Sequence, residues 1–245
     1  MSGLTEQRFM IMDKVLIAGV SSGLGTQLAR LCLEKGSRVF GGYVHLNRDL
    51  QDLADAYKDS LHLFEMNVDS EEAVRVAAHR VSEHTDSLDL IINAFGVLNR
   101  RNACALSEFD IDGSMDLINV NMLGPLRVAK YFENLLLSGD MKVLVNISSE
   151  AGSMATNNQY RDRYDYCMSK AGVNMQSVIL QRYWYNQGVK VLAVHPGWMK
   201  TRMGGERAVL DPAVSAAGIL ELAYRYMHQP DREIYFDYNG TPRPW

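Results

Sequence analysis

The chain has 245 residues, of which 47% are hydrophobic and 22% are charged, values that suit one large globular domain or two small ones. Its formal net charge of −4 argues against nucleic-acid binding, which usually needs a basic surface, so the pair Arg100-Arg101 is interpreted as solvated charge. No apolar run reaches the roughly 18 residues of a membrane-spanning helix, so no membrane partner is expected either.

Apolar runs that are typical of strands alternate with segments of helical length. In chain order, the sequence predicts a strand at 14–19, a helix at 26–36, strands at 38–44 and 61–66, a helix at 70–84, a strand at 88–96 and a helix at 111–137. It then predicts a strand at 142–149, a helix at 163–187, a strand at 189–197, a helix at 211–228 and a short strand at 233–237.

The predicted strands are apolar along their whole length, which is typical of parallel strands that helices cover on both faces. We therefore expect an α/β fold with a single doubly wound (Rossmann) domain over residues 13–245 and a mainly parallel, seven-stranded sheet. Residues 1–12 lack the basic segment and apolar run of a signal peptide and are expected to form a flexible arm.

The three cysteines, Cys32, Cys104 and Cys167, are odd in number and far apart in the sequence. They have neither the spacing of a metal site nor that of a disulfide framework. A reduced, cytoplasmic location and the absence of a metal are therefore expected.

Three glycines, Gly19, Gly23 and Gly25, lie between the first predicted strand and its helix. The N-terminus of a helix presents free N–H groups and a positive dipole end, and glycines let phosphate groups approach the backbone. A plain strand–helix turn is the alternative, but it does not need three glycines. The cluster therefore predicts a dinucleotide site.

Tyr166 and Lys170 are spaced one helical turn apart, so they share a face of the predicted helix at 163–187. Taken alone, this spacing indicates little, because it arises by chance in many helices. Its meaning depends on the motifs that surround it in the chain.

Several short motifs follow one another along the chain. They are Ala18-Gly19 to Gly25, Asn67-Val68, Asn93-Ala94-Phe95-Gly96, Asn121, Ser148 to Gly152, Tyr166 to Lys170, and Pro196-Gly197 to Thr201. With these motifs in the family's order, the chain resembles the classical short-chain dehydrogenases/reductases over about residues 14–240. The chain departs from the family's threonine at Ala18, from its aspartate at Asn67 and from its N-N-A-G at 93–96. The loop before Tyr166 and the aromatic C-terminal end also resemble the C-factor/sniffer group of carbonyl reductases.

The resemblance implies an NAD(P)(H)-dependent oxidoreductase that transfers hydride between a nicotinamide and a small carbonyl or secondary alcohol substrate. The catalytic residues that it implies are Asn121, Ser149, Tyr166 and Lys170. Ser149 would hydrogen-bond the substrate oxygen, and Tyr166 would be the general acid/base. Asn121 would hold a water that links Lys170 to solvent, and Lys170 would also contact the nicotinamide ribose.

A phenol with its ordinary pKa near 10 is a poor acid/base at neutral pH. An ammonium about 4 Å away would stabilise the phenolate by about 4 kcal/mol at an effective dielectric near 20, or roughly three pKa units. We therefore expect Lys170 to lower the pKa of Tyr166 toward the operating pH.

The resemblance also implies a set of cofactor-binding residues in addition to Tyr166 and Lys170. They are Gly19, Ser21, Ser22, Gly23, Leu24, Tyr43, Asn67, Val68, Asn93, Ala94, Phe95, Gly96, Pro196, Gly197, Met199 and Thr201.

The second strand ends at Tyr43, where an acidic residue would favour NAD. The absence of an acid, with His45 and Arg48 just beyond, favours NADP(H) over NAD(H). The alternative is that His45 and Arg48 are only surface residues at the start of a helix.

At the substrate end, Trp198 and Met199 are expected to line an open pocket behind a short lid after Thr201. Arg161 and Arg163 are interpreted as solvated charges at a helix start, and His195 as a structural residue. Phe95 is interpreted as a larger wall beside the adenosine, and the sequence does not name the substrate.

The family commonly pairs its long helices between subunits, so a homo-oligomer, dimer or tetramer, is expected. Val173, Val178, Ile179 and Leu180 give the helix at 163–187 more apolar surface than one sheet face requires. A nucleotide-binding regulatory or signalling protein that keeps the fold is the alternative function, because a signalling role is attributed to the C-factor relative.

Overall fold

The computed structural model describes residues 13–156 and 160–245, so the expected arm at 1–12 lies outside the described residues. The strands are β1 (Lys14–Ala18), β2 (Arg38–Tyr43), β3 (Leu61–Glu65), β4 (Leu90–Asn93), β5 (Val143–Ile147), β6 (Lys190–His195) and β7 (Tyr235–Asp237). The helices are α1 (Gly23–Glu34), α2 (Arg48–Ala56), α3 (Glu71–Ser82), α4 (Met115–Ile118), α5 (Gly124–Leu137), α6 (Tyr164–Tyr183) and α7 (Pro212–Tyr226).

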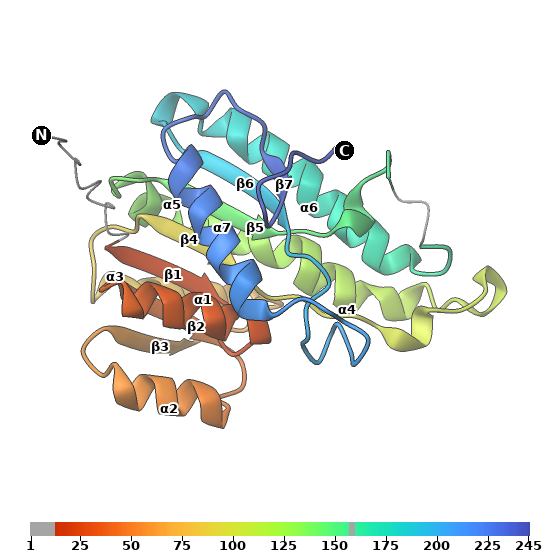
Figure 1. The fold of residues 1–245 in the computed structure, drawn as a ribbon, viewed down its shortest axis with the longest axis horizontal. Helices are drawn as coiled ribbons and strands as arrows, with labels where there is room; N and C mark the ends of the chain where they lie inside the picture. Colours follow the sequence, from red (N-terminus) through yellow and green to blue (C-terminus); the bar gives the residue numbers. More distant parts are fainter. Residues whose placement is uncertain (1–12, 157–159) are drawn as a thin grey trace, which may run out of the picture.

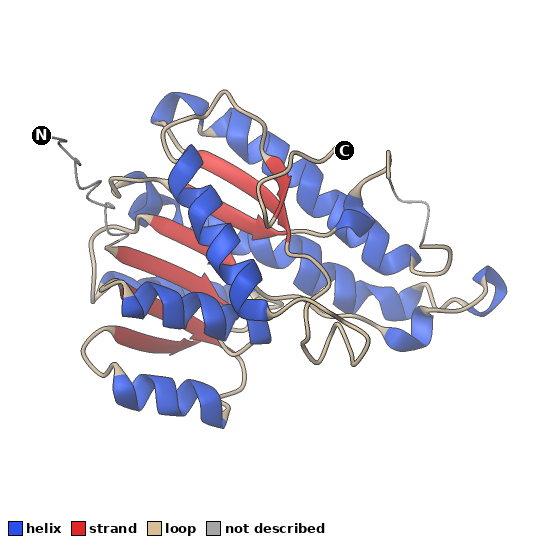
Figure 2. Ribbon diagram, viewed as in Figure 1, coloured by secondary structure: helices blue, strands red, loops and turns tan. Residues whose placement is uncertain are grey.

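Within the described ranges, the seven strands form one sheet in the order β3-β2-β1-β4-β5-β6-β7, and every neighbouring pair is parallel (Figure 1). Helices α1, α2 and α7 cover one face, and α3, α5 and α6 cover the other (Figure 2). The predicted doubly wound α/β fold with a seven-stranded sheet is confirmed.

Side chains of β1 show why the strands are apolar without alternation. Val15 and Ile17 join the hydrophobic core under α1, α2 and α7, whereas Leu16 and Ala18 join the core under α3, α5 and α6. Both faces of the sheet are therefore removed from water, and consecutive residues must be hydrophobic.

The structure differs from the predicted elements in two places. Helix α2 was not among the predicted helices, because it is short and polar and buries only Leu50 and Leu53. The single helix predicted at 111–137 is divided: a π-helical turn, Asn119–Leu123, separates α4 from α5. Such turns often occur at functional sites.

The strand order reverses between β1 and β4, and in doubly wound sheets a ligand crevice opens at the carboxyl ends of the strands at this point. Gly19, just after β1, has φ +85°, a conformation that favours glycine. A Cβ at Gly19 would lie 2.8 Å from the Cβ of Phe95, which follows β4. The two strand ends therefore approach so closely that Gly19 has no room for a side chain.

The ring of Phe95 occupies space that Gly124 leaves open. A Cβ at Gly124 would lie 2.9 Å from Cε2 of Phe95 and 3.2 Å from the Cβ of Val68. The aromatic residue that departs from the family's N-N-A-G thus packs against the start of α5 and against the segment after β3. Phe95 is partly buried against the core under α3, α5 and α6.

We predict that Gly124→Ala lowers the free energy of unfolding by about 1–3 kcal/mol, because the added methyl overlaps the Phe95 ring. In a Phe95→Ala background, the same substitution should cost much less, since the ring is gone. Urea unfolding of the four proteins gives the coupling free energy, which should reach at least about 0.5 kcal/mol. If the double variant lost the sum of the two single losses in free energy of unfolding, the proposed contact between position 124 and the Phe95 ring would be contradicted.

Candidate active site

The glycine-rich turn after β1 shapes the N-terminus of α1. The Ser22 hydroxyl accepts a hydrogen bond from the Gly25 N–H at 2.9 Å and donates one to the Ala94 carbonyl at 3.0 Å. A Cβ at Gly25 would collide with the Gly19 carbonyl oxygen. Ser21 and Ser22 are partly exposed and Gly23 is exposed, so the start of the helix can receive a pyrophosphate. The Leu24 side chain lies in the core, so only its backbone can contribute.

The N-terminus of α2 is fastened to this turn. Asn47 caps α2 through the Leu50 N–H at 2.9 Å, and its amide nitrogen donates to the Ser21 carbonyl at 3.0 Å. Tyr43 is partly buried at the end of β2, while His45 and Arg48 are exposed. The end of β2 thus carries no acid, and Arg48 lies 4.0 Å from Asp52 on the exposed side of α2.

The segments after β3 and β4 provide mainly buried side chains. Val68 and Ala94 are buried, and Asn93 donates to Asn146 of β5 at 2.8 Å, so Asn93 joins two strands within the protein. The Asn93 carboxamide oxygen has no hydrogen-bond partner within the described ranges. Asn67 remains partly exposed.

The segment after β6 closes over the start of α1. A Cβ at Gly23 would lie 2.8 Å from Cγ2 of Thr201. Gly197 has φ +77°, and the Pro196 carbonyl accepts a hydrogen bond from Ser215 of α7 at 2.7 Å. The predicted cofactor residues lie at or follow the ends of five parallel strands, β1, β2, β3, β4 and β6, and therefore gather at one edge of the sheet. The exposed Gly23 at the start of α1 fits the approach of a pyrophosphate, and Pro196, Gly197, Met199 and Thr201 line the neighbouring cavity.

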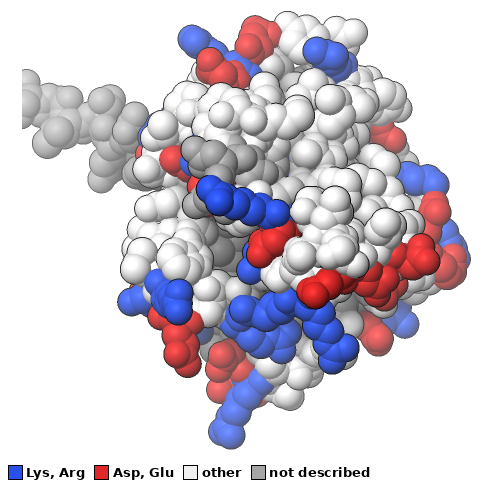
Figure 3. All heavy atoms as spheres, turned by 90° about the vertical axis from the view of Figure 1, so that its right-hand side faces the viewer, with Lys and Arg blue, Asp and Glu red and all other residues white. Residues whose placement is uncertain are grey.

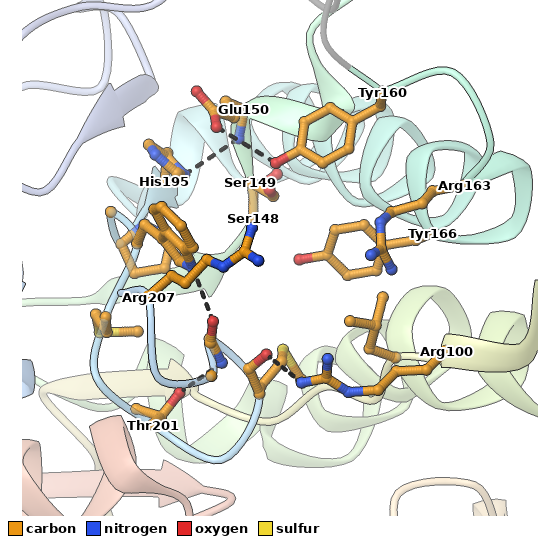
Figure 4. A pocket seen from close by; sticks show the side chains of 18 of the residues that line it. Arg100, Ser148, Ser149, Glu150, Tyr160, Arg163, Tyr166, His195, Thr201 and Arg207 are labelled. Atoms are coloured by element: carbon orange, nitrogen blue, oxygen red, sulfur yellow. Dashed lines mark hydrogen bonds between the residues drawn. The ribbon is translucent and has the colours of Figure 1, made fainter. Parts of the chain in front are cut away.

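Ser149, Tyr166 and Lys170 meet where β5 and α6 approach each other. Figure 4 shows the Tyr166 hydroxyl pointing into a cavity that Ser149 also lines. The Lys170 ammonium is buried, donates to the Ile147 carbonyl at 2.8 Å, and lies over the Tyr166 ring, 5.9 Å from its centre. A Cβ at Gly96 would lie 3.8 Å from this nitrogen, so Gly96 belongs to the same site.

The expectation that Lys170 lowers the pKa of Tyr166 is wrong for this structure. Burial raises the pKa of the Tyr166 phenol, and the opposing effects come from a hydrogen bond with Ser149 and from the charge of Arg163. The reason is geometric, because the ammonium lies over the ring and is bound to the Ile147 carbonyl. Burial also lowers the pKa of Lys170 itself to about 8.

Asn121 lies in the π-helical turn and is buried. Its amide group donates to the Val97 carbonyl at 2.9 Å and to the Ser169 hydroxyl at 3.3 Å, and its oxygen accepts from the Val97 N–H at 2.8 Å. Pro125 has no N–H to give the Asn121 carbonyl its α-helical bond. The side chain is thus fully engaged, and the backbone carbonyl is the group suited to hold a water.

The cavity in front of Tyr166 has a volume of about 820 Å³. Trp198 and Met199 line it as predicted, and Met203 to Arg207 from the short segment after Thr201 form one wall. The sequence analysis assigned no role to Tyr160 and interpreted Arg163 as a solvated charge, but both line the cavity, and Nη1 of Arg163 is buried. Arg100 lines the cavity as well and is exposed, as expected for a solvated charge. No local motif marks these positions.

His195 lines the same cavity, and its geometry agrees with the structural role expected for it. Its Nδ1 accepts a hydrogen bond from the Glu150 N–H at 3.2 Å, which fixes the segment after β5 to the end of β6. Burial lowers the pKa of His195 to about 4, so the ring is neutral at pH 7.

In the described part of the chain, no helix is long and apolar enough to cross a membrane. The same residues contain no cluster of three or more His, Cys, Asp or Glu side chains that could hold a metal ion.

The fold and this site define a dinucleotide-binding oxidoreductase. Residues 13–209 match the short chain dehydrogenase family, and the chain belongs to that family. It is 33% identical over 161 residues to the C-signal protein of Myxococcus xanthus, a match that covers 66% of this chain and 95% of that protein.

Two solved structures resemble the chain closely. The carbonyl reductase Sniffer of D. melanogaster superposes with a TM-score of 0.86 at 24% identity and covers 96% of this chain and 100% of that one. A carbonyl reductase from Pseudomonas aeruginosa in complex with NADP superposes with a TM-score of 0.77 at 27% identity, again over 96% and 100%. The resemblance to the C-factor/sniffer group is thus confirmed, and the protein is an oxidoreductase of this family.

Proposed function

We propose that the protein is a carbonyl reductase that uses a nicotinamide cofactor and in which Tyr166 is the general acid/base. The observation that carries this proposal is the direction of the Tyr166 hydroxyl, which faces the cavity beside Ser149 (Figure 4). The predicted cofactor residues gather at the same edge of the sheet. The carbonyl reductase structures that the chain resembles support the substrate class.

When bound, the reduced nicotinamide supplies the hydride that adds to the carbonyl carbon. The Ser149 hydroxyl holds the carbonyl oxygen, and the Tyr166 phenol donates its proton to that oxygen. A phenol with a raised pKa keeps its proton at neutral pH, which suits it to act as the acid in the reduction.

Lys170 and Asn121 position the proton donor. The buried Lys170 ammonium lies over the ring and next to Gly96, where it would contact the nicotinamide ribose. Asn121 donates to the Ser169 hydroxyl at 3.3 Å, which in turn donates to the Tyr166 carbonyl at 2.8 Å. The first turn of α6 is thereby held to the loop after β4.

NADP(H) is proposed as the preferred cofactor. An acidic residue at the end of β2 would repel a 2′-phosphate, and Tyr43 stands there instead. The exposed Arg48 opens α2, whose N-terminus is tied to the glycine turn through Asn47 and Ser21. The relative solved in complex with NADP supports the same choice.

A nucleotide-binding signalling protein remains a second candidate because of the similarity to the C-signal protein. Such a protein would bind the cofactor without needing an acid in the cavity. The two candidates therefore differ in whether turnover depends on Tyr166.

A homo-oligomer formed through α5 and α6 is also proposed. Two of the apolar residues expected on this surface, Val173 and Leu180, are instead buried, because they face the protein interior. The exposed apolar side chains of Leu126, Met175 and Ile179 support the pairing.

We predict that Tyr166→Phe lowers kcat for aldehyde reduction by about 10²–10⁴-fold, because the proton donor is lost while the ring is kept. Cofactor binding, measured by intrinsic fluorescence, should persist. Lys170→Met should also lower kcat and should weaken cofactor binding. Tyr160→Phe removes another cavity hydroxyl and is the matched control, with a far smaller loss. Near-normal turnover of Tyr166→Phe would refute the assignment.

NADPH should bind about tenfold more tightly than NADH, the effect of one charge-assisted hydrogen bond. Arg48→Gln should reduce this ratio. Lys58→Gln removes a positive charge just beyond the opposite end of α2 and should leave the ratio unchanged. Fluorescence titrations measure both constants, and tighter binding of NADH by the wild type would overturn the preference.

Light scattering at micromolar concentration should give the mass of a dimer or a tetramer. Ile179→Asp should reduce that mass, because it places a charge on the proposed apolar interface. Val214→Asp, at an exposed apolar residue of α7 on the opposite face of the sheet, should not. A monomeric wild type would contradict the proposal.

A further inference from the structure

Arg163 occupies an unusual position at the wall of the cavity. It immediately precedes α6 and lies three residues before Tyr166. Figure 4 shows its guanidinium beside the Tyr166 ring, and it lines the same cavity. Its Nη1 atom is buried and has no hydrogen-bond acceptor anywhere in 13–156 or 160–245.

A buried guanidinium nitrogen without an acceptor is costly to keep. Leaving such a donor unpaired costs about 1–3 kcal/mol, and more when the group is charged. The acceptor that best matches the planar guanidinium is a carboxylate, which can accept two parallel hydrogen bonds. Arg163 lines the cavity, and Figure 4 shows its guanidinium at the wall beside Tyr166, so a carboxylate on the substrate would offer it an acceptor there.

Two further arginines reach the cavity from its rim. Arg100 follows β4, and its guanidinium donates to the Met203 carbonyl at 3.1 Å, which holds it over the opening. Arg207 points into the cavity from the opposite wall (Figure 4). On the face seen in Figure 3, basic side chains border a hollow in the surface, with acidic side chains beside them.

No ion pair of the described residues joins Arg163 to an acid, although acidic residues lie nearby. Glu150 lines the cavity but pairs with Arg243 at 3.5 Å and accepts a hydrogen bond from Tyr160 at 3.3 Å. Asp162 and Glu206 also line the cavity.

We propose that the substrate carries a carboxylate in addition to the carbonyl group that Tyr166 protonates, and that Arg163 receives this carboxylate, with Arg100 and Arg207 at the rim. The inference rests on the proposed carbonyl reduction. The carboxylate is unchanged by the reaction. Hydride addition at the carbonyl carbon and protonation of its oxygen give a hydroxy acid and oxidised cofactor.

The test compares 4-carboxybenzaldehyde with its methyl ester, which has the same aldehyde but no charge. The wild type should show a kcat/KM for the acid that is about 10–100-fold higher than for the ester, the effect of one charge-assisted pair. Arg163→Gln should bring this ratio close to one. High salt should reduce the ratio in the wild type.

Arg161→Gln is the matched control, because Arg161 is exposed, lies two residues away and is not part of the cavity lining. It removes the same charge and should leave the ratio unchanged. The proposal would be overturned if the wild type had the same kcat/KM for the acid and the ester. It would also be overturned if Arg163→Gln and Arg161→Gln changed the ratio equally, even with normal reduction of the ester.

A binding measurement separates this inference from the proposed activity. Because Trp198 lines the cavity, intrinsic fluorescence can follow the binding of 4-(hydroxymethyl)benzoate and of its methyl ester. Preference for the acid that disappears in Arg163→Gln, without any aldehyde reduction, would sustain the carboxylate site and refute the reductase. Aldehyde reduction without a preference for the acid, in rate or in binding, would sustain the reductase and refute the carboxylate site. A protein that shows neither aldehyde reduction nor a preference for the acid would refute both proposals.

Discussion

The site depends on the burial of one ammonium group, that of Lys170, where α6 meets β5. A charge removed from water needs polar partners, and the Ile147 carbonyl supplies one at 2.8 Å. The backbone of Lys170 is packed closely as well. A Cβ at Gly152, shortly after β5, would lie 2.6 Å from the Lys170 carbonyl carbon, so this close approach of α6 requires a glycine at position 152. Once α6 is held there, Tyr166 is directed into the cavity.

Polar side chains hold α6 against the sheet where hydrophobic packing would be expected. Asn146 of β5 donates to the Ser177 hydroxyl at 2.9 Å, and Ser148 donates to Asn174 at 2.6 Å. Hydrogen bonds fix one register and one rotation of the helix more narrowly than apolar contacts do. The interior face of α6 therefore positions the reacting groups as well as stabilising the fold.

Strands and most helices could be predicted because burial on two faces leaves an unmistakable apolar pattern. The motif residues could be predicted from the family resemblance, but their physical environment could not. Burial raises the pKa of Tyr166, and neither this burial nor the position of the Lys170 nitrogen over the ring is determined by spacing along a helix. Arg163 was interpreted as solvated charge for a similar reason, since only the folded loops show that its nitrogen is buried.

We propose that the glycine turn, the segment after β6 and the cavity at Tyr166 form one continuous site for a dinucleotide and a carbonyl compound. The central claim is that hydride passes directly between them. The most direct test uses NADPH deuterated at C4, on either face in separate reactions, with 4-carboxybenzaldehyde and mass spectrometry of the alcohol. The account predicts one deuterium at the former carbonyl carbon from one of the two cofactors. No alcohol, or alcohol without deuterium from either cofactor, would contradict it.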